Sequence, residues 1–135
     1  MTPFVWQARV YWEDTDAGGI VYYANYLRFL ERARSEWLRA RGVSQLALAR
    51  EPGVVFSVVA LEVQYRRPAR LDDMLSISCD PHWQGGASLM FAQRIWRDPA
   101  DADLLVSASV RVACLDAATL KPRRLPPVIV RELSA

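Results

Sequence analysis

The fold is encoded most densely in residues 13–26, which read Glu13-Asp14-Thr15-Asp16-Ala17-Gly18-Gly19-Ile20-Val21-Tyr22-Tyr23-Ala24-Asn25-Tyr26. Before this stretch the sequence alternates as a strand does, and after it apolar residues recur at the spacing of an amphipathic helix. A carboxylate at a strand end can attack a carbonyl, and the free N–H groups at a helix start can hold the oxyanion that forms. The stretch therefore predicts an active-site loop between a strand and a helix.

The elements on either side of this loop are predicted from their periodicity. From Phe4 to Trp12, side chains alternate at period two, which indicates a strand with one apolar face. The helix is expected to begin near Ala24 or Asn25, and Gly42 is suited to end it. Its apolar stripe contains Tyr26, Leu27, Leu30, Ala33, Trp37 and Leu38.

Strands are predicted for most of the remaining chain. Ser44 can cap a short helical turn that ends at Glu51-Pro52-Gly53. From there to the C-terminus the chain reads as nearly all strand, with runs at 54–66, 75–79, 89–96 and 104–115. One long helix followed by strands predicts an α+β fold in which an antiparallel sheet wraps around a single central helix.

Length and composition limit the class of protein. The 135 residues suit a single domain spanning 1–135, and no apolar run approaches the ~20 residues of a membrane span. The N-terminus lacks the pattern of a secretory signal, so we expect a cytoplasmic protein without membrane insertion. A net charge of +2 is too weak to indicate nucleic-acid binding.

The cysteines and the histidine give no indication of a metal site. Cys79 and Cys114 fall in separate strand-like runs without a partner motif, so we expect reduced thiols in the core. His82 is the only histidine and precedes a turn, which favours a surface or structural role over zinc binding or catalysis.

The predicted sheet keeps two free edges. A long apolar edge strand favours pairing with a second copy of the chain, so we expect a homodimer. Whether such dimers pair further into a homotetramer is left open by the sequence.

Several segments of the chain resemble a known family. Residues 10–26 and 29–34 look like the hotdog-fold acyl-CoA thioesterases of the 4-hydroxybenzoyl-CoA thioesterase branch. Residues 68–75, 91–95 and 121–123 make the chain most similar, within that branch, to the Tol-Pal-system-associated acyl-CoA thioesterases. The resemblance runs from about Arg9 to the C-terminus and implies a hotdog fold and hydrolysis of an acyl-CoA.

The resemblance also implies roles for residues of the loop. The catalytic carboxylate of the family corresponds to Asp16, which would act as a nucleophile or as a base that activates water. The backbone N–H that polarises the thioester carbonyl corresponds to that of Tyr23. Some relatives have a histidine where Tyr23 stands, so a mechanism that needs an imidazole there is in doubt. No cofactor is implied, because CoA is part of the substrate.

Other residues are predicted to bind the substrate. Gly18 and Gly19 would allow positive φ and close approach of the thioester. Basic residues near loops would meet the CoA phosphates, and a serine after a turn is a weaker candidate; they are Arg67, Lys121, Arg123, Arg124 and Ser88.

Each of these roles has a structural alternative. Asp16 could form an Asx turn, and the arginines could pair with neighbours such as Asp72 and Asp73. Glu13 and Asp14 could solvate the strand end or pair with arginine, and Asn25 could cap the helix or position the loop.

Three other functions compete with acyl-CoA hydrolysis. A hotdog dehydratase or hydratase would need a histidine paired with an acid, and none lies near the loop. The substrate could instead be presented by acyl carrier protein, for which a basic surface would be suited. The chain could also be a non-catalytic partner in an envelope or lipid-synthesis assembly.

Overall fold

A computed structural model describes residues 4–83, 85–98 and 103–134. Its strands are β1 (Phe4–Arg9), β2 (Val54–Tyr65), β3 (Met74–Trp83), β4 (Ser88–Arg97) and β5 (Asp103–Asp116). Its α-helices are α1 (Tyr26–Ala40), α2 (Gln45–Arg50) and α3 (Pro127–Ser134), and two 3-10 turns, η1 (Trp12–Asp14) and η2 (Tyr23–Asn25), flank the predicted loop.

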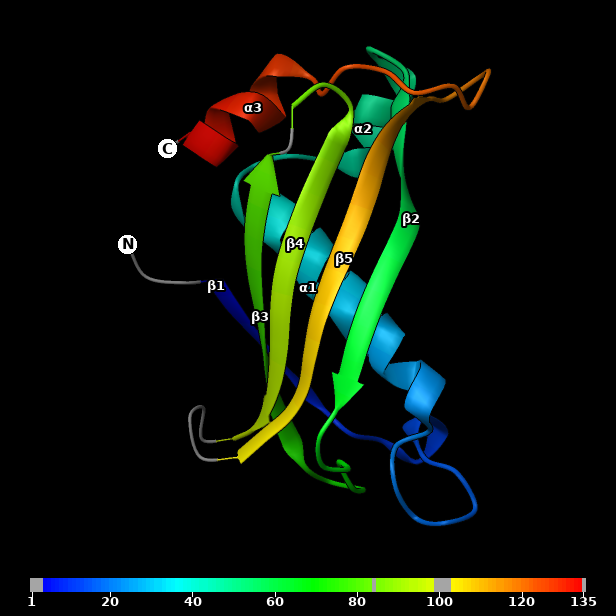
Figure 1. Cartoon of the computed structure of the whole chain (residues 1–135), viewed down its shortest axis with the longest axis vertical. Coiled ribbons are helices and arrows are strands. Elements are labelled where there is room, and N and C mark those ends of the chain that lie inside the picture. Colours follow the sequence, from blue (N-terminus) through cyan, green and yellow to red (C-terminus); the bar gives the residue numbers. More distant parts are fainter. Residues whose placement is uncertain (1–3, 84, 99–102, 135) are drawn as a thin grey trace.

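The strands form one antiparallel sheet in the order β1-β3-β4-β5-β2. The sheet covers α1, which crosses behind it at a slant (Figure 1). β1 and β2 are the edge strands, and the register of β2 shifts between Val58 and Ala60. This arrangement confirms the predicted α+β hotdog fold, in which a sheet wraps around one long helix.

Helix α1 lies against the sheet through its apolar stripe, whose buried members are Tyr26, Phe29, Leu30, Ala33, Trp37 and Leu38. The helix ends at Ala40, and Gly42 follows its C-cap with a φ of 77°, as predicted for the glycine that stops it. The N–H of Gly42 donates to the carbonyl of Arg39 and that of Val43 to the carbonyl of Leu38, which satisfies the last carbonyls of the helix. The first turns of α1 project beyond the β2 edge, so the predicted loop lies on that side of the molecule (Figure 1).

The expectation that the chain is nearly all strand to its C-terminus is wrong, because residues 127–134 form α3. Val128, Ile129 and Val130 favour strand by intrinsic propensity. Burial overrides this preference: Ile129 is fully buried, and Val128 and Val130 pack against the same core. Pro127 at the first helical position is a start signal that the sequence contained.

Both cysteines are free and buried, which confirms the prediction of core thiols. Burial raises the pKa of Cys79 to about 12 and also raises the pKa of Cys114. Within the described residues, no helix is long and apolar enough to cross a membrane.

Candidate active site

Residues 14–22 form a short hairpin-like loop between η1 and η2. Thr15 and Val21 make an antiparallel bridge, and the N–H of Asp16 donates to the carbonyl of Ile20 at 2.9 Å. The N–H of Val21 also donates to the carbonyl of Ala69 at 2.9 Å, which ties the loop to the connection between β2 and β3. The loop is therefore held on both sides by backbone hydrogen bonds.

The carboxylate of Asp16 is exposed on this loop. Its Oδ1 accepts a hydrogen bond from the N–H of Gly18 at 2.8 Å, which is the Asx-turn geometry considered above. Its Oδ2 has no hydrogen-bond donor among the described residues. The turn therefore orients the carboxylate and leaves one oxygen available, so turn formation and catalysis do not exclude each other.

The two glycines of the loop have different reasons to be glycine. A Cβ at Gly18 would lie 3.2 Å from Oδ1 of Asp16, so a larger residue here would shift the carboxylate by a few tenths of an ångström. Gly19 has a φ of 80°, a conformation that L side chains rarely adopt, with open space around it. The predicted positive φ is confirmed for Gly19 and is wrong for Gly18, which is constrained instead by its contact with Asp16.

Tyr23 is the first residue of η2, at the end of the loop that leads into α1. Its N–H has no acceptor among the described residues, as expected for the first N–H of a helical turn. Its carbonyl accepts a hydrogen bond from the hydroxyl of Tyr65 at 3.0 Å. The side chain is 64% exposed and its ring lies 5.0 Å from that of Tyr22. The backbone N–H is therefore free to donate to a ligand.

Asp14 and Asn25 are buried and hydrogen-bonded to each other. The two alternatives considered for Asp14, that it solvates the strand end or that it pairs with arginine, are therefore wrong. Nδ2 of Asn25 donates to Oδ1 of Asp14 at 2.8 Å, and the N–H of Tyr11 donates to Oδ2 of Asp14 at 2.8 Å. The side chain of Asn25 makes no capping bond to α1. Of the roles considered for Asn25, positioning the loop is the one that these contacts support.

The predicted substrate-binding residues lie at opposite ends of the sheet. Arg67 follows the end of β2, close to the loop, and its guanidinium pairs with Asp103 at 3.0 Å. Ser88 begins β4 and residues 121–124 follow β5, at the end of the sheet where β2 begins (Figure 1). At about 3.3 Å per residue, the 12 residues of β2 separate these two ends by roughly 40 Å. A single chain does not bring all predicted site residues together.

Within residues 121–124 the cations differ in their surroundings. The guanidinium of Arg123 donates to the carbonyls of Pro52 and Gly53 at 3.0 and 3.2 Å and lies 3.3 Å from the carboxylate of Asp116. The side chains of Lys121 and Arg124 are exposed and have no partner among the described residues. Arg123 is thus committed to a structural contact, while Lys121 and Arg124 are free to meet an anion.

An apolar groove runs beside the first half of α1. It has a volume of about 390 Å³ and is lined mainly by Leu27, Leu30, Val58, Leu61 and Val110, from α1, β2 and β5. Its apolar lining suits the hydrocarbon part of an acyl group.

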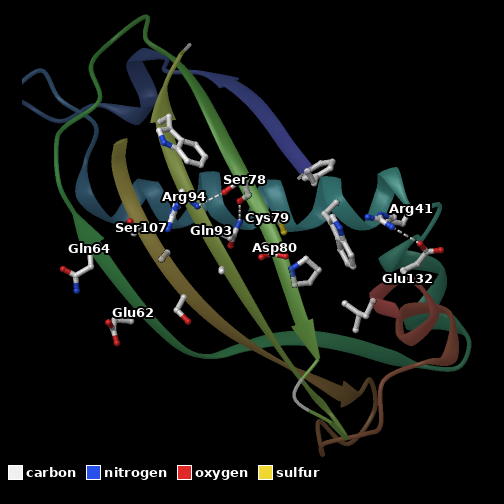
Figure 2. A pocket seen from close by; sticks show the side chains of 18 residues that line it. Arg41, Glu62, Gln64, Ser78, Cys79, Asp80, Gln93, Arg94, Ser107 and Glu132 are labelled. Carbon is white, nitrogen blue, oxygen red and sulfur yellow. Dashed lines mark hydrogen bonds and ion pairs between the residues drawn. The ribbon is translucent and has the colours of Figure 1, made fainter. Parts of the chain in front are cut away.

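A larger hollow of about 800 Å³ lies elsewhere, across β2 to β5 and towards α3. Figure 2 shows its polar lining, with Glu62, Gln64, Arg94 and Ser107 on the strands and the ion pair of Arg41 and Glu132 at one end. None of the predicted site residues lines it.

His82 has the predicted surface position. Its Nε2 lies 3.1 Å from a carboxylate oxygen of Asp80, and both side chains are exposed on β3. No histidine lies on the 14–22 loop, so the histidine-dependent dehydratase or hydratase has no support there.

Comparison with protein families finds a match over most of the chain. The model of the thioesterase-like superfamily matches residues 10–133. Among curated proteins, the acyl-CoA thioester hydrolase YbgC of Escherichia coli O6:H1 is 51% identical over 131 residues, which cover 97% of this chain and 96% of that protein. The acyl-CoA thioesterase YbgC of Haemophilus influenzae is 42% identical, with 91% of this chain and 88% of that protein covered.

Solved structures with the same fold include other thioesterases. A probable thioesterase from Bartonella henselae is 39% identical, with a TM-score of 0.85 and coverage of 93% of this chain and 100% of that chain. A 1,4-dihydroxy-2-naphthoyl-CoA thioesterase from Synechocystis has a TM-score of 0.90, with coverage of 98% of this chain and 96% of that chain. At 21% sequence identity, the second likeness shows the fold alone.

Proposed function

This chain belongs to the thioesterase-like superfamily, and from that membership we propose how it acts on its substrate. It is an acyl-CoA thioester hydrolase, which splits an acyl-CoA into a free carboxylic acid and CoA. The observation that carries the assignment of its active site is the 14–22 loop. Asp16 has an oxygen free to react in this loop, and directly after it the N–H of Tyr23 has no acceptor among the described residues.

Asp16 can act by either of two routes. As a nucleophile, its carboxylate bonds to the thioester carbon, CoA leaves as the thiolate, and water opens the resulting mixed anhydride. As a general base, it takes a proton from a water that attacks the same carbon, and the thiolate leaves in the same way. Both routes use no metal or cofactor and end in the same acid and CoA.

The N–H of Tyr23 would stabilise the oxyanion that forms on either route. It is a backbone donor at the start of a helical turn, where the dipole of the following α1 favours negative charge. Loss of one such donor typically lowers kcat by about 10²–10³-fold. The phenol of Tyr23 is not needed for this role, which agrees with the absence of a histidine at this position.

The site is completed by a second copy of the chain. Apolar side chains are exposed along the β2 edge, where Val58, Val59 and Leu61 are 41%, 54% and 46% exposed. An unpaired edge strand with exposed apolar residues favours pairing with another strand. Antiparallel pairing of β2 with β2 of a second copy would cover this edge and give a homodimer with two-fold symmetry. Pairing of dimers into a homotetramer is compatible with it.

This dimer would join the two separated groups of predicted residues. In an antiparallel pair, the end of β2 in one copy lies next to the start of β2 in the other. The end of β2 carries Tyr65, which is bonded to Tyr23, and the start is held by Arg123 through Gly53. Lys121 and Arg124 of one copy would thus approach the loop of the other, where they can bind the CoA phosphates.

Release of free thiol from a panel of short, long and aromatic acyl-CoAs tests the proposal. Wild type is expected to turn over at least part of the panel, while folded Asp16→Asn and Asp16→Ala variants lose turnover. Wild type that releases no thiol from any acyl-CoA would contradict hydrolysis of CoA esters. That result would favour a carrier-protein substrate or a non-catalytic binding role.

Acyl carrier protein is a second candidate for presenting the acyl group. Four exposed arginines near the loop have no ion pair among the described residues, namely Arg28, Arg32, Arg66 and Arg70. Such a basic surface suits an acidic carrier protein. Binding of acyl carrier protein to the enzyme at low salt that is lost at high salt would support this carrier. Turnover of acyl-CoA esters that equals turnover of the carrier-protein esters would argue against it.

We also propose that the enzyme works in the cytoplasm, as the sequence predicted. Cys79 and Cys114 are unpaired, as is usual in a reducing compartment, and this supports the proposal. Fractionation of cells that produce the tagged protein would test the location.

A further inference from the structure

The buried pair of Asp14 and Asn25 joins the two ends of the active-site loop. Each residue is only 6% exposed, and the Nδ2 to Oδ1 hydrogen bond between them measures 2.8 Å. The carbonyl of Asp14 also accepts the N–H of Tyr22 at 3.0 Å. Asp14 thus contacts both the residue before Tyr23 and the residue two positions after it.

Asp14 also caps the turn η1 by accepting the N–H of Tyr11, so the side-chain hydrogen bonds of the pair all lie within residues 11–25. Asn25 makes no capping bond to α1, and no basic side chain among the described residues forms an ion pair with Asp14. Burying a carboxylate without a cation costs free energy that hydrogen bonds must offset. Here the hydrogen bonds come from the N–H of Tyr11 and from Asn25, on the two sides of the loop.

We infer that Asp14 and Asn25 are positioning residues for thioester hydrolysis, which together set the distance between the Asp16 carboxylate and the Tyr23 N–H. The inference rests on the proposed function of those two groups. Asp14 lies two residues before Asp16 and Asn25 two residues after Tyr23, so their hydrogen bond fixes both reacting groups relative to each other. A misplacement of about 1 Å can lower turnover about 10²-fold.

The chemistry of the pair makes its test specific. In Asn25→Asp two carboxylates face each other at a hydrogen-bond distance, so at a pH where both are ionised they repel and the loop opens. In Asp14→Asn the amide of Asn25 can turn its oxygen towards the new amide, so a hydrogen bond survives. In the double variant Asp14→Asn/Asn25→Asp the donor and the acceptor have changed places, and one hydrogen bond is restored. The hydrogen bond to a carboxylate in the double variant is stronger than the bond between two neutral amides in Asp14→Asn, so kcat should rise from Asn25→Asp through Asp14→Asn to the double variant.

The experiment compares kcat and KM for thiol release among these variants, wild type and the control Asp80→Asn, which removes an exposed carboxylate on β3. Asn25→Asp should lower kcat about tenfold or more with KM within about twofold, and the double variant should return kcat to within about threefold of wild type. Asp14→Asn should fall between them, and the control should match wild type. A folded double variant no better than Asn25→Asp, or a wild-type kcat in Asn25→Asp, would overturn the inference.

A second readout does not depend on turnover. Amide hydrogen exchange at Gly18 and Tyr22 should quicken in Asn25→Asp and slow again in the double variant, because both amides are bonded within the loop. Wild type without thioesterase activity would refute the proposed function, and the exchange rates would still decide whether the pair orders the loop. Equal amide exchange rates in wild type and all variants would refute the role of Asp14 and Asn25 in ordering the loop.

Discussion

The carboxylate of Asp16 has its two oxygens in different surroundings. Oδ1 is held by the N–H of Gly18 at 2.8 Å, and Oδ2 has no donor among the described residues. A carboxylate held by its own loop needs little reorganisation before it reacts. The same residue can therefore form the turn and carry out the chemistry.

Gly18→Ala tests the contact between that glycine and the carboxylate. The new Cβ would lie 3.2 Å from Oδ1 of Asp16 and push the carboxylate aside, so kcat for thiol release should fall about tenfold or more. Gly19→Ala is the matched control. Its strain at a φ of 80° should lower the free energy of unfolding by about 1 kcal/mol with a smaller effect on kcat. A larger loss of kcat in Gly19→Ala would contradict this reading of the loop.

The two thiols should not react in the folded protein. Cys79 and Cys114 are buried, and burial raises the pKa of Cys79 to about 12, so almost no thiolate exists at neutral pH. A chromogenic disulfide reagent should label neither cysteine in the native state and both in urea. Rapid labelling of the native protein would contradict the buried positions and would also disturb the thiol-release assay.

At the level of elements, the segment after β5 stabilises the start of β2. The carboxylate of Asp116 accepts the N–H groups of Thr119 and Ala118 at 2.9 Å each, and Arg123 joins it to the carbonyl of Gly53. These contacts lower the pKa of Asp116, with the hydrogen bond from Thr119 as the largest cause. The segment predicted to bind CoA therefore also has a structural role.

Asp116→Asn should make stability less sensitive to acid. Since the pKa is lower in the folded than in the unfolded state, ionised Asp116 stabilises the fold above the unfolded-state pKa. This contribution is lost as the pH falls through the folded-state pKa. Urea unfolding should show that the free energy of unfolding drops less in the variant than in wild type between about pH 7 and about pH 3. Equal drops would contradict the role given to these hydrogen bonds.

Local pattern was enough to predict the central elements, because their signals are short-range. The period-two runs became strands, although the first ends at Arg9 and its predicted last residue, Trp12, lies in η1. The apolar stripe became α1, and Ser44 caps α2 by accepting the N–H of Ala47. Helix α3 was missed because burial of Ile129 overrides its strand propensity. The bond between Asp14 and Asn25 was missed because it depends on how the loop closes in three dimensions. The sequence did contain the Asp16 and Tyr23 motif itself.

For the whole molecule, the main consequence is that one chain holds the proposed site in two separate parts. The loop with Asp16 lies at one end of β2, and Lys121 and Arg124 lie at the other (Figure 1). The apolar groove beside α1 includes Val58 and Leu61 of the exposed β2 edge. A homodimer paired through β2 would bring the apolar groove, the loop with Asp16 and the cations Lys121 and Arg124 into one proposed site.

Mixed dimers test this arrangement. Asp16→Asn alone should lack turnover, and Lys121→Glu/Arg124→Glu alone should have a raised KM for acyl-CoA. The mixture is assayed at an acyl-CoA concentration well below the raised KM, where neither variant alone is active. After subunit exchange about half of the dimers are mixed and each has one complete site, so about a quarter of wild-type activity should return. Mixing that restores no activity, while dimers are seen to exchange, would contradict a site shared between copies.

Tyr23→Pro removes the proposed oxyanion donor with little change to the backbone. Proline has no N–H and is tolerated at the first position of a helical turn. The preceding Tyr22, at φ −60° and ψ 130°, already has a conformation that suits a following proline. Tyr23→Phe is the matched control, because it keeps the N–H and loses only the phenol.

The decisive measurement is kcat for CoA release by folded Asp16→Asn, Tyr23→Pro and Tyr23→Phe beside wild type. If the Asp16 carboxylate and the Tyr23 N–H hydrolyse the thioester, Asp16→Asn falls to near background and Tyr23→Pro falls by about 10²–10³-fold. Tyr23→Phe should stay within about threefold of wild type. Wild-type turnover in folded Asp16→Asn, or equal losses in Tyr23→Pro and Tyr23→Phe, would contradict the proposed site.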